Sequence, residues 1–171
     1  MQKKLPKYIL RRSFDYHFLF TDYEVNYNDQ FNKQIQEFSK KNGGIEIIVE
    51  IMNFKQIKEY KKYSIIKISN TDSRSLSVLE NIPLIRDQSV SDLLGYYYIF
   101  DDTKEWEFYV SIIDETSVFG CNNSCIENFR EIFKPYKDFT LNDKIKEIYS
   151  CCDIREKRQF FIKELCNNYK L

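Results

Sequence analysis

Several residue types are scarce in this chain of 171 residues, and each shortage excludes a class of protein. There is no alanine, and only four glycines and three prolines are present. A P-loop, a dinucleotide-binding loop and the pyrophosphate loop of an acetyl-CoA enzyme all need clustered glycines. The glycines at 43, 44, 95 and 120 do not supply such a cluster, so we expect no phosphate-binding loop of these kinds.

The cysteines do not describe a disulfide framework. Their number is odd, five in all, and Cys151 and Cys152 are neighbours, so a bond between them would be strained. We predict reduced thiols, as is usual in a cytosol, at Cys121, Cys125, Cys151, Cys152 and Cys166.

Long apolar runs are also missing. The longest, Ile45 to Met52, is interrupted by Glu46 and Glu50, and it is far shorter than the ~20 residues of a membrane-spanning helix. The basic N-terminus has no apolar segment behind it, because Arg11, Arg12 and Asp15 intervene. We therefore expect no signal peptide and no membrane association, and we place the protein in the cytoplasm.

Net charge is absent as well, because 26 basic side chains balance 26 acidic ones. A general nucleic-acid binder is basic, so we do not expect nucleic acid as a partner. The balance is uneven along the chain, however. Residues 1–79 hold 14 basic and 9 acidic side chains, residues 80–115 hold 2 and 9, and residues 116–171 hold 10 and 8. The zero is a cancellation between a strongly acidic central block and two basic flanks.

What is present in quantity is aromatic and β-branched sequence, which predicts strands. We predict strands over 14–20, 45–52 and 63–69, and a helix in which Phe31, Ile35 and Phe38 recur and Gly43-Gly44 closes the segment. Between Phe54 and Tyr63, the residues Ile57 and Tyr60 lie among five charges, which favours a short exposed helix. Residues 70–91 are expected to be an irregular connection.

The clearest pattern is a hairpin of strands 96–100 and 105–113, followed by a short strand over 117–120. In its second strand Trp106, Phe108, Val110 and Ile112 share one face, and Glu105, Glu107, Tyr109 and Ser111 share the other. The alternation predicts a sheet with one apolar and one polar face.

After Ser124 the apolar period changes to that of a helix, with Ile126, Phe129, Ile132 and Phe133 in one stripe before Pro135. Further helices are expected from Thr140 and from Asp153. The fold class predicted is α+β. A single domain over 1–171 would have a central, largely antiparallel sheet that includes a 96–120 meander, helices packed on one side, and a helical C-terminal third over 123–171.

The patterns that suggest catalysis or metal binding each have a simpler interpretation. Cys121 and Cys125 fit a zinc-ligand spacing loosely, but buried thiols are the better interpretation. His17 is the single histidine and lies in an apolar strand, where a structural role is favoured over catalysis. Asp87 with Asp102-Thr103-Lys104 imitates a nuclease motif, yet the residues after Asp101 form a predicted turn. We therefore expect no catalytic residue, no metal and no cofactor.

The acidic block has two interpretations, a solvated edge kept from aggregating by charge and a docking surface for a basic partner. For the second, the candidate partner-binding residues are Asp101, Asp102, Glu105, Glu107, Asp114, Glu115, Tyr97 and Tyr109.

The stretch from Tyr98 to Phe133 reads YIFDDTKEWEFYVSIIDETSVFGCNNSCIENFREIF. It resembles the closing segment of many small bacterial immunity proteins, which neutralise toxins of contact-dependent growth inhibition and related polymorphic toxin systems. There an aromatic strand, a polar turn, an aromatic strand with a tryptophan, a short strand ending in glycine and an amphipathic helix follow in that order. Trp106 and Gly120 correspond to the tryptophan and the glycine of that pattern.

The resemblance implies a non-catalytic protein that binds a cognate toxin domain, often a nuclease, and blocks it in the cytoplasm. Toxin nucleases tend to be basic because their substrate is polyanionic, so an acidic patch on the inhibitor would mimic phosphate. Two alternatives stay open, a small Cys- or metal-dependent enzyme and a mobile-element accessory protein that binds another host factor. The sequence leaves the oligomeric state open.

Overall fold

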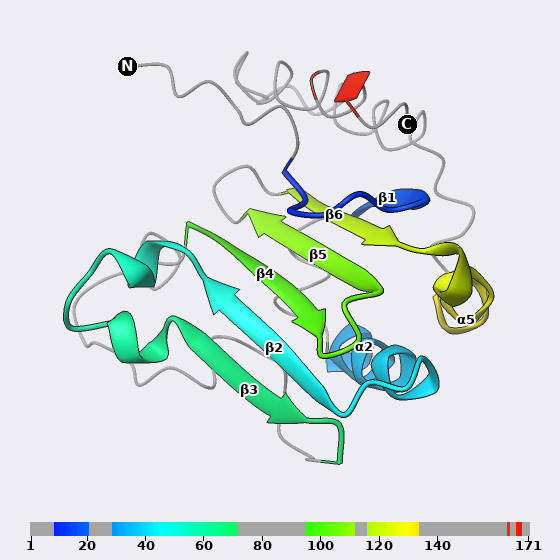
Figure 1. Ribbon diagram of the computed structural model, residues 1–171, viewed down its shortest axis with the longest axis horizontal. Helices are drawn as coiled ribbons and strands as arrows, with labels where there is room; N and C mark the ends of the chain where they lie inside the picture. Colours follow the sequence, from blue (N-terminus) through cyan, green and yellow to red (C-terminus); the bar gives the residue numbers. More distant parts are fainter. Residues whose placement is uncertain are drawn as a thin grey trace.

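The computed structural model describes residues 9–20, 29–71, 95–111, 116–133, 164 and 167–168. Its centre is a six-stranded sheet in the order β1-β6-β5-β4-β2-β3, in which each pair of neighbours is antiparallel (Figure 1). The strands are β1 (Tyr16–Phe20), β2 (Glu46–Ile51), β3 (Ile65–Ser69), β4 (Tyr96–Asp101), β5 (Trp106–Ser111) and β6 (Thr116–Cys121). The α+β class, the hairpin and the meander predicted from sequence are confirmed.

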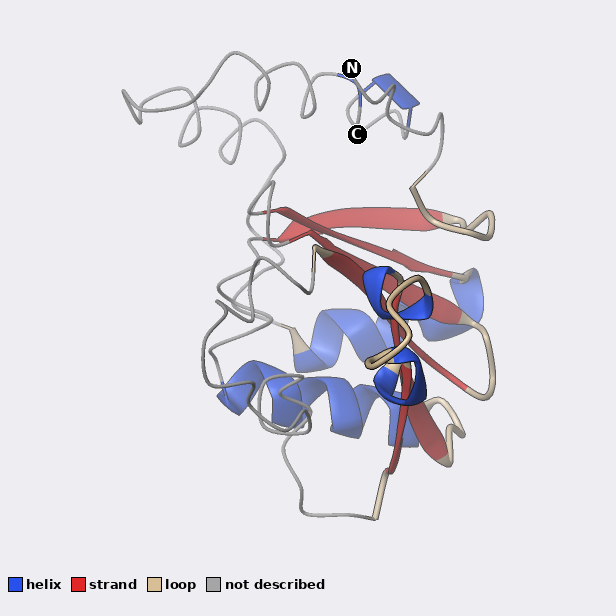
Figure 2. Ribbon diagram, turned by 90° about the vertical axis from the view of Figure 1, so that its left-hand side faces the viewer, coloured by secondary structure: helices blue, strands red, loops and turns tan. Residues whose placement is uncertain are grey.

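Helices α2 (Asp29–Lys41) and α5 (Ile126–Ile132) lie on the same side of the sheet (Figure 2). Phe31, Ile35 and Phe38 recur on one face of α2, and each is fully buried. Gly43 adopts a φ of 83°, which a glycine reaches without steric cost, and so ends the helix as predicted. The apolar stripe of α5 is confirmed up to Phe133, whereas Pro135 lies outside the described residues.

The core between these helices and the sheet is strongly aromatic. Trp106, Phe108 and Val110 of β5 all point into it with no exposed surface, as the alternation of that strand predicts. Phe119 of β6 stacks on Phe129 of α5 with ring centroids 4.8 Å apart. Burial of large rings, each hiding about 150–250 Å², is what holds the helices on this face.

The opposite face of the sheet is not the open polar face that the sequence predicts. Residues 9–14 of the N-terminal segment lie against it, and Leu10 and Phe14 pack with Tyr98, Tyr109 and Val118 in a second apolar cluster. Gly120 of β6 makes room for this, because a Cβ there would lie 2.6 Å from Leu10. Consequently every described side chain of β5 is buried, Glu107 and Ser111 included.

The segment expected to be a short helix over 54–63 consists instead of two 3₁₀ turns, η1 (Asn53–Lys55) and η2 (Lys61–Tyr63). The apolar residues recur every third position, and the amide of Tyr60 donates to the carbonyl of Ile57 at 3.0 Å. A period of three matches 3₁₀ geometry, in which side chains three apart eclipse, and not the 3.6 of an α-helix.

Several predicted elements lie outside the described residues. They are the helices expected from Thr140 and Asp153, and most of the irregular connection over 70–91. The helical C-terminal third therefore stays a prediction. Among the residues that are described, no helix is long and apolar enough to span a membrane.

Candidate functional site

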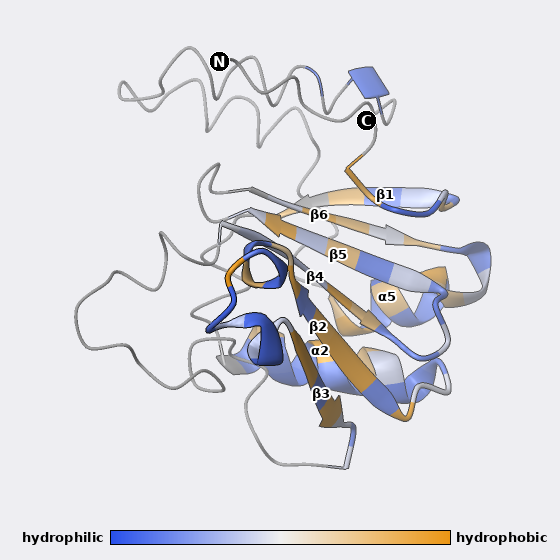
Figure 3. Ribbon diagram, turned by 60° about the vertical axis from the view of Figure 1, so that its left-hand side comes forward, coloured by the Kyte–Doolittle hydropathy of each residue, from blue (hydrophilic) through white to orange (hydrophobic). Residues whose placement is uncertain are grey.

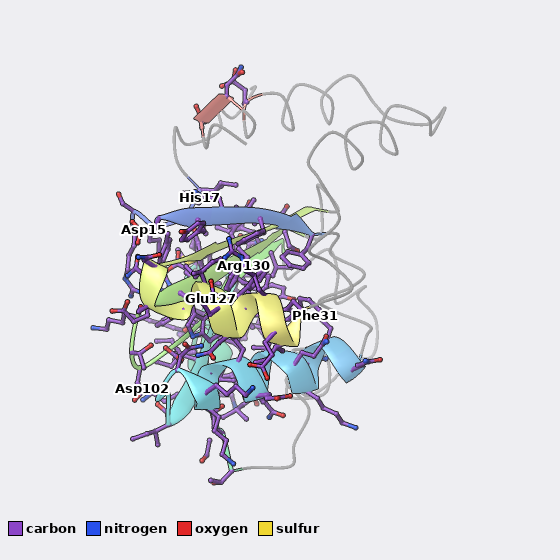
Figure 4. All side chains as sticks on the ribbon, turned by 90° about the vertical axis from the view of Figure 1, so that its right-hand side faces the viewer. Asp15, His17, Phe31, Asp102, Glu127 and Arg130 are labelled. Carbon is purple, nitrogen blue, oxygen red and sulfur yellow. The ribbon has the colours of Figure 1, made fainter. Side chains whose placement is uncertain are left out.

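One end of the sheet gathers acidic side chains from four separate strand termini. Asp15 precedes β1, Glu46 begins β2, Asp102 follows β4 and Glu105 precedes β5. Because neighbouring strands are antiparallel, the start of one lies beside the end of the next, and the register pairs confirm this arrangement. We call these four residues the acidic end. Asp15 and Asp102 lie on the same side of the molecule in Figure 4.

Asp102 is exposed and its carboxylate is held by backbone donors. Its Oδ1 atom accepts hydrogen bonds from the amide of Ile45 at 2.8 Å and the amide of Glu46 at 3.1 Å. These backbone hydrogen bonds lower the pKa of Asp102, although partial burial opposes them. The negative charge is therefore secure at neutral pH, and its position is fixed relative to the start of β2.

Glu105 is half-exposed and is held by the chain that follows β6. Its Oε2 atom accepts hydrogen bonds from the amide of the Asn122 side chain at 2.8 Å and the hydroxyl of Ser124 at 3.0 Å. Asp15 is fixed in a similar way, since its Oδ2 atom accepts the backbone amide of Asn123 at 2.8 Å. The loop after β6 therefore positions both carboxylates.

The turn between Asp102 and Glu105 has a second distinctive feature. Lys104 adopts a φ of 63°, a left-handed conformation, in the loop that joins β4 to β5. Beside this turn, the side chain of Ile45 is 73% exposed. An exposed apolar side chain with polar groups around it matches, on a small scale, the apolar centre and polar rim of protein-binding surfaces. Glu46 contributes less charge there, because Lys67 pairs with it at 2.8 Å.

Four of the residues predicted to bind a partner are instead buried. Asp101, Glu107, Tyr97 and Tyr109 are each at most 5% exposed, so they cannot contribute to a surface in this conformation. Tyr97 faces the helices, whereas Tyr109 and Glu107 lie under the N-terminal segment. The structure therefore does not present these four at the surface, because Tyr97 and Asp101 lie on the face that the helices cover, and Glu107 and Tyr109 lie on the face that the N-terminal segment covers.

Asp101 ties three elements together inside the protein. Its Oδ2 atom accepts hydrogen bonds from the hydroxyl of Ser39 on α2 and from the indole Nε1 of Trp106 on β5, both at 2.7 Å. Its Oδ1 atom accepts the amide of Thr103 at 3.0 Å and also the hydroxyl of that residue. A buried carboxylate with four donors is a structural anchor.

Glu107 has an equivalent role on the other face. It accepts the backbone amide of Arg11 at 2.9 Å and forms an ion pair with the guanidinium of that residue at 3.1 Å. The same guanidinium lies 4.2 Å from the ring centre of Tyr98 and also pairs with Glu50. Burial opposes the charge of Arg11, but the two carboxylates outweigh it and raise its pKa. Glu107 thus fastens the N-terminal segment to the sheet.

Asp102 and Glu105 are therefore the predicted site residues that the structure brings together on the surface. Asp114 and Glu115 lie outside the described residues. Sequence reasoning missed Asp15, Ile45 and Glu46, which join the same end of the sheet. The strand starts at 14 and 45 were predicted, but only the strand order β1-β6-β5-β4-β2 places them beside the hairpin turn.

Among the described residues, no group of three or more His, Cys, Asp or Glu side chains is arranged to hold a metal ion. Cys121 and Cys125 are free thiols and both are buried, as predicted. Burial raises the pKa of Cys121 to about 12 and raises that of Cys125 as well. Burial also lowers the pKa of His17, against the charge of Asp15. Cys151, Cys152 and Cys166 lie outside the described residues.

Comparisons with protein-family models, with curated proteins and with solved structures return no match to this chain.

Proposed function

We propose that this protein is a cytoplasmic immunity protein that binds a cognate bacterial toxin domain, a nuclease being the expected class, and blocks it by occlusion. The observation that carries the proposal is the acidic end of the sheet. There Asp102 and Glu105 present carboxylates that the fold already holds in place, beside the exposed side chain of Ile45. A preorganised surface loses less conformational entropy on binding, so more of its contact energy contributes to affinity.

The chemistry of the surface suits a basic protein partner. Fixed carboxylates attract lysine and arginine, and they accelerate association because opposite charges steer the encounter. A nuclease must bind polyanionic nucleic acid, so its active-site cleft is basic and is complementary to such a surface. The order of β4, β5, β6 and α5 also agrees with the order of elements that the resemblance to immunity proteins implies.

The alternative of a cysteine enzyme is disfavoured for the two described thiols. A thiolate is the nucleophile in such enzymes, and burial keeps Cys121 and Cys125 protonated at neutral pH. An accessory protein that binds another host factor would use the acidic end as its binding surface in the same way. Only the identity of the partner separates it from the proposal.

The test has two parts. Co-expression with the toxin domain encoded beside this chain should restore growth of cells that the toxin otherwise arrests. In stopped-flow binding at low salt, the double variant Asp102→Lys, Glu105→Lys should associate with that domain about tenfold or more slowly, and the salt dependence should flatten.

A matched control separates local from global charge. The double variant Glu37→Lys, Glu59→Lys changes the net charge equally, but at exposed positions that are not part of the acidic end, on α2 and between η1 and η2. It should leave association nearly unchanged. Failure of rescue contradicts the immunity function itself. Rescue with equal association rates for both double variants contradicts only the acidic end as the docking site.

A further inference from the structure

A second surface of the protein lies along the opposite edge of the sheet. Strand β3 is the last strand in the order and pairs only with β2 among the described strands. The amide of Ile51 donates to the carbonyl of Ser64 at 2.8 Å, and the amide of Asn70 donates to the carbonyl of Ile45 at 2.9 Å. In an antiparallel pair the residues that bond to the neighbour alternate, so positions 64, 66, 68 and 70 face β2. The amides and carbonyls of Ile65, Lys67 and Ser69 therefore point away from the sheet.

Within the described residues, this edge carries few of the devices that usually protect an exposed strand. It contains no proline, and the side chain of Ile65 is 50% exposed. The one charged side chain of the strand is Lys67, which pairs with the carboxylate of Glu46 at 2.8 Å but stays exposed, so the edge carries a single lysine. Figure 3 shows β3 as an apolar strand at the margin of the sheet, with strongly hydrophilic turns just before it.

Those turns carry concentrated positive charge. Lys58, Lys61 and Lys62 are exposed, and no ion pair to another described residue neutralises them, whereas Lys55 is paired with Glu50. Together with Glu59, these three lysines make up what we call the cationic turn. Its backbone is anchored, because the ring of Tyr60 stacks on that of buried Phe54 with centroids 5.0 Å apart.

We propose that the edge of β3 binds an extended, acidic segment of a protein partner, which adds to the sheet as a further strand and places its carboxylates near the cationic turn. Main-chain hydrogen bonds to Ile65, Lys67 and Ser69 would supply affinity, and the lysines would select acidic sequences. This surface is independent of the proposed toxin-binding end, and neither proposal requires the other.

Other occupants fit the edge less well. A nucleic acid matches the positive charge, but it has no ladder of amides and carbonyls to pair with the strand. A second copy of this chain could pair its own β3 with this β3, in which case the two strands would run antiparallel about a two-fold axis. When that pairing is centred on the strand, Lys67 of each copy faces Lys67 of the other, and like charges directly opposite are destabilising.

The probe is a fluorescently labelled peptide of alternating glutamate and valine, which is acidic and favours extended structure. Fluorescence anisotropy should show that it binds at least about tenfold more tightly than a peptide with lysine in place of glutamate. Amide exchange measured by NMR should slow at Ile65, Lys67 and Ser69 when the acidic peptide is present. Methylating alternate peptide nitrogens in the acidic peptide removes donors without altering the protein, and it should abolish binding.

Protein variants locate the site. Lys67→Pro removes one outward-pointing amide and leaves the bonds between β2 and β3 intact, so it should abolish binding. Lys67→Thr removes the same charge but keeps the amide, so binding should persist. Lys61→Glu, Lys62→Glu should weaken binding about tenfold or more, whereas Lys33→Glu, Lys40→Glu on α2 has the same net charge change and should not.

Four results would overturn the proposal. They are no binding of the acidic peptide, full binding after its backbone is methylated, tighter binding of a single-stranded oligonucleotide than of the peptide, and a protein dimer that Lys67→Pro dissociates. If the Lys67→Pro variant fails to fold, the methylated peptide still decides the question, because it uses the unaltered protein.

Discussion

Replacing Asp101 with alanine should destabilise the protein by about 3–5 kcal/mol, because the loss strands several hydrogen-bond donors. The hydroxyl of Ser39 and the indole of Trp106 are buried and both donate to Asp101 at 2.7 Å. The amide of Thr103 donates at 3.0 Å but is near the surface, so water can replace part of that bond. Each buried unpaired donor costs about 1–3 kcal/mol, and the total is a large fraction of the 5–15 kcal/mol that typically separates folded from unfolded states.

The asparagine variant distinguishes hydrogen bonding from simple loss of volume. Asp101→Asn keeps the shape and one acceptor, which can serve Ser39 and Trp106. The NH₂ group of the asparagine then faces the backbone amide of Thr103, which is also a donor, so that hydrogen bond is lost. The hydroxyl of Thr103 can turn to accept a hydrogen bond from the NH₂ group instead. The expected cost is about 1–3 kcal/mol, so stability should fall from wild type to Asp101→Asn to Asp101→Ala.

Equilibrium unfolding in urea measures this order, followed by far-UV circular dichroism and by the fluorescence of Trp106, the one tryptophan of the chain. Asp102→Asn is the matched control, because it makes the same chemical change one residue away at an exposed position. It should cost less than about 1 kcal/mol, as surface substitutions usually do. If Asp101→Ala costs no more than this control, the reasoning about buried donors is refuted.

Four further outcomes are expected. Gly120→Ala should cost about 1–3 kcal/mol in urea unfolding, because its methyl group meets the N-terminal segment on the sheet; no loss would mean that the segment adjusts freely. In the folded protein Cys121 and Cys125 should stay unreactive toward a thiol reagent at neutral pH, and modification faster than unfolding would contradict their burial. Because the fold lowers the pKa of Asp102, its ionised carboxylate stabilises the protein at pH values above the ordinary pKa of 3.8, and this contribution is lost as the pH falls through the lower pKa of the folded state. Asp102→Asn should therefore lose less stability on acidification than the wild type. Lys104→Gly should stabilise by up to about 1 kcal/mol, because glycine adopts the positive φ of that turn without steric cost, and a loss would indicate that the lysine side chain matters.

Local patterns predicted most of the described fold. The apolar face of β5 and the helical spacing of Phe31, Ile35 and Phe38 depend on which side chains can be buried together, and the structure confirms both, whereas the predicted polar face of β5 is also buried. The segment over 54–63 was misread as a helix, although its apolar period of three was already visible and indicates a 3₁₀ turn.

The site was predicted less well, because exposure depends on what covers a face. Glu107 and Tyr109 alternate with apolar residues in the sequence as solvent-facing side chains would. Nothing local shows that residues 9–14, about a hundred positions away, lie over them. One signal was available: Arg11 and Arg12 lie beside the apolar residues Ile9, Leu10 and Phe14, and buried carboxylates require partners of opposite charge.

Composition and local patterns are enough to show that the chain combines strands with amphipathic helices, that it has no cluster of glycines, and that its charge cancels between a central acidic block and basic flanks. How that charge is distributed over the molecule depends on the tertiary fold. It buried Asp101 and Glu107 as anchors, left Asp102 and Glu105 at one end of the sheet and placed the lysines of the cationic turn beside the edge of β3. Strand order and the covering of each face are long-range properties, because they depend on contacts between residues far apart in the chain.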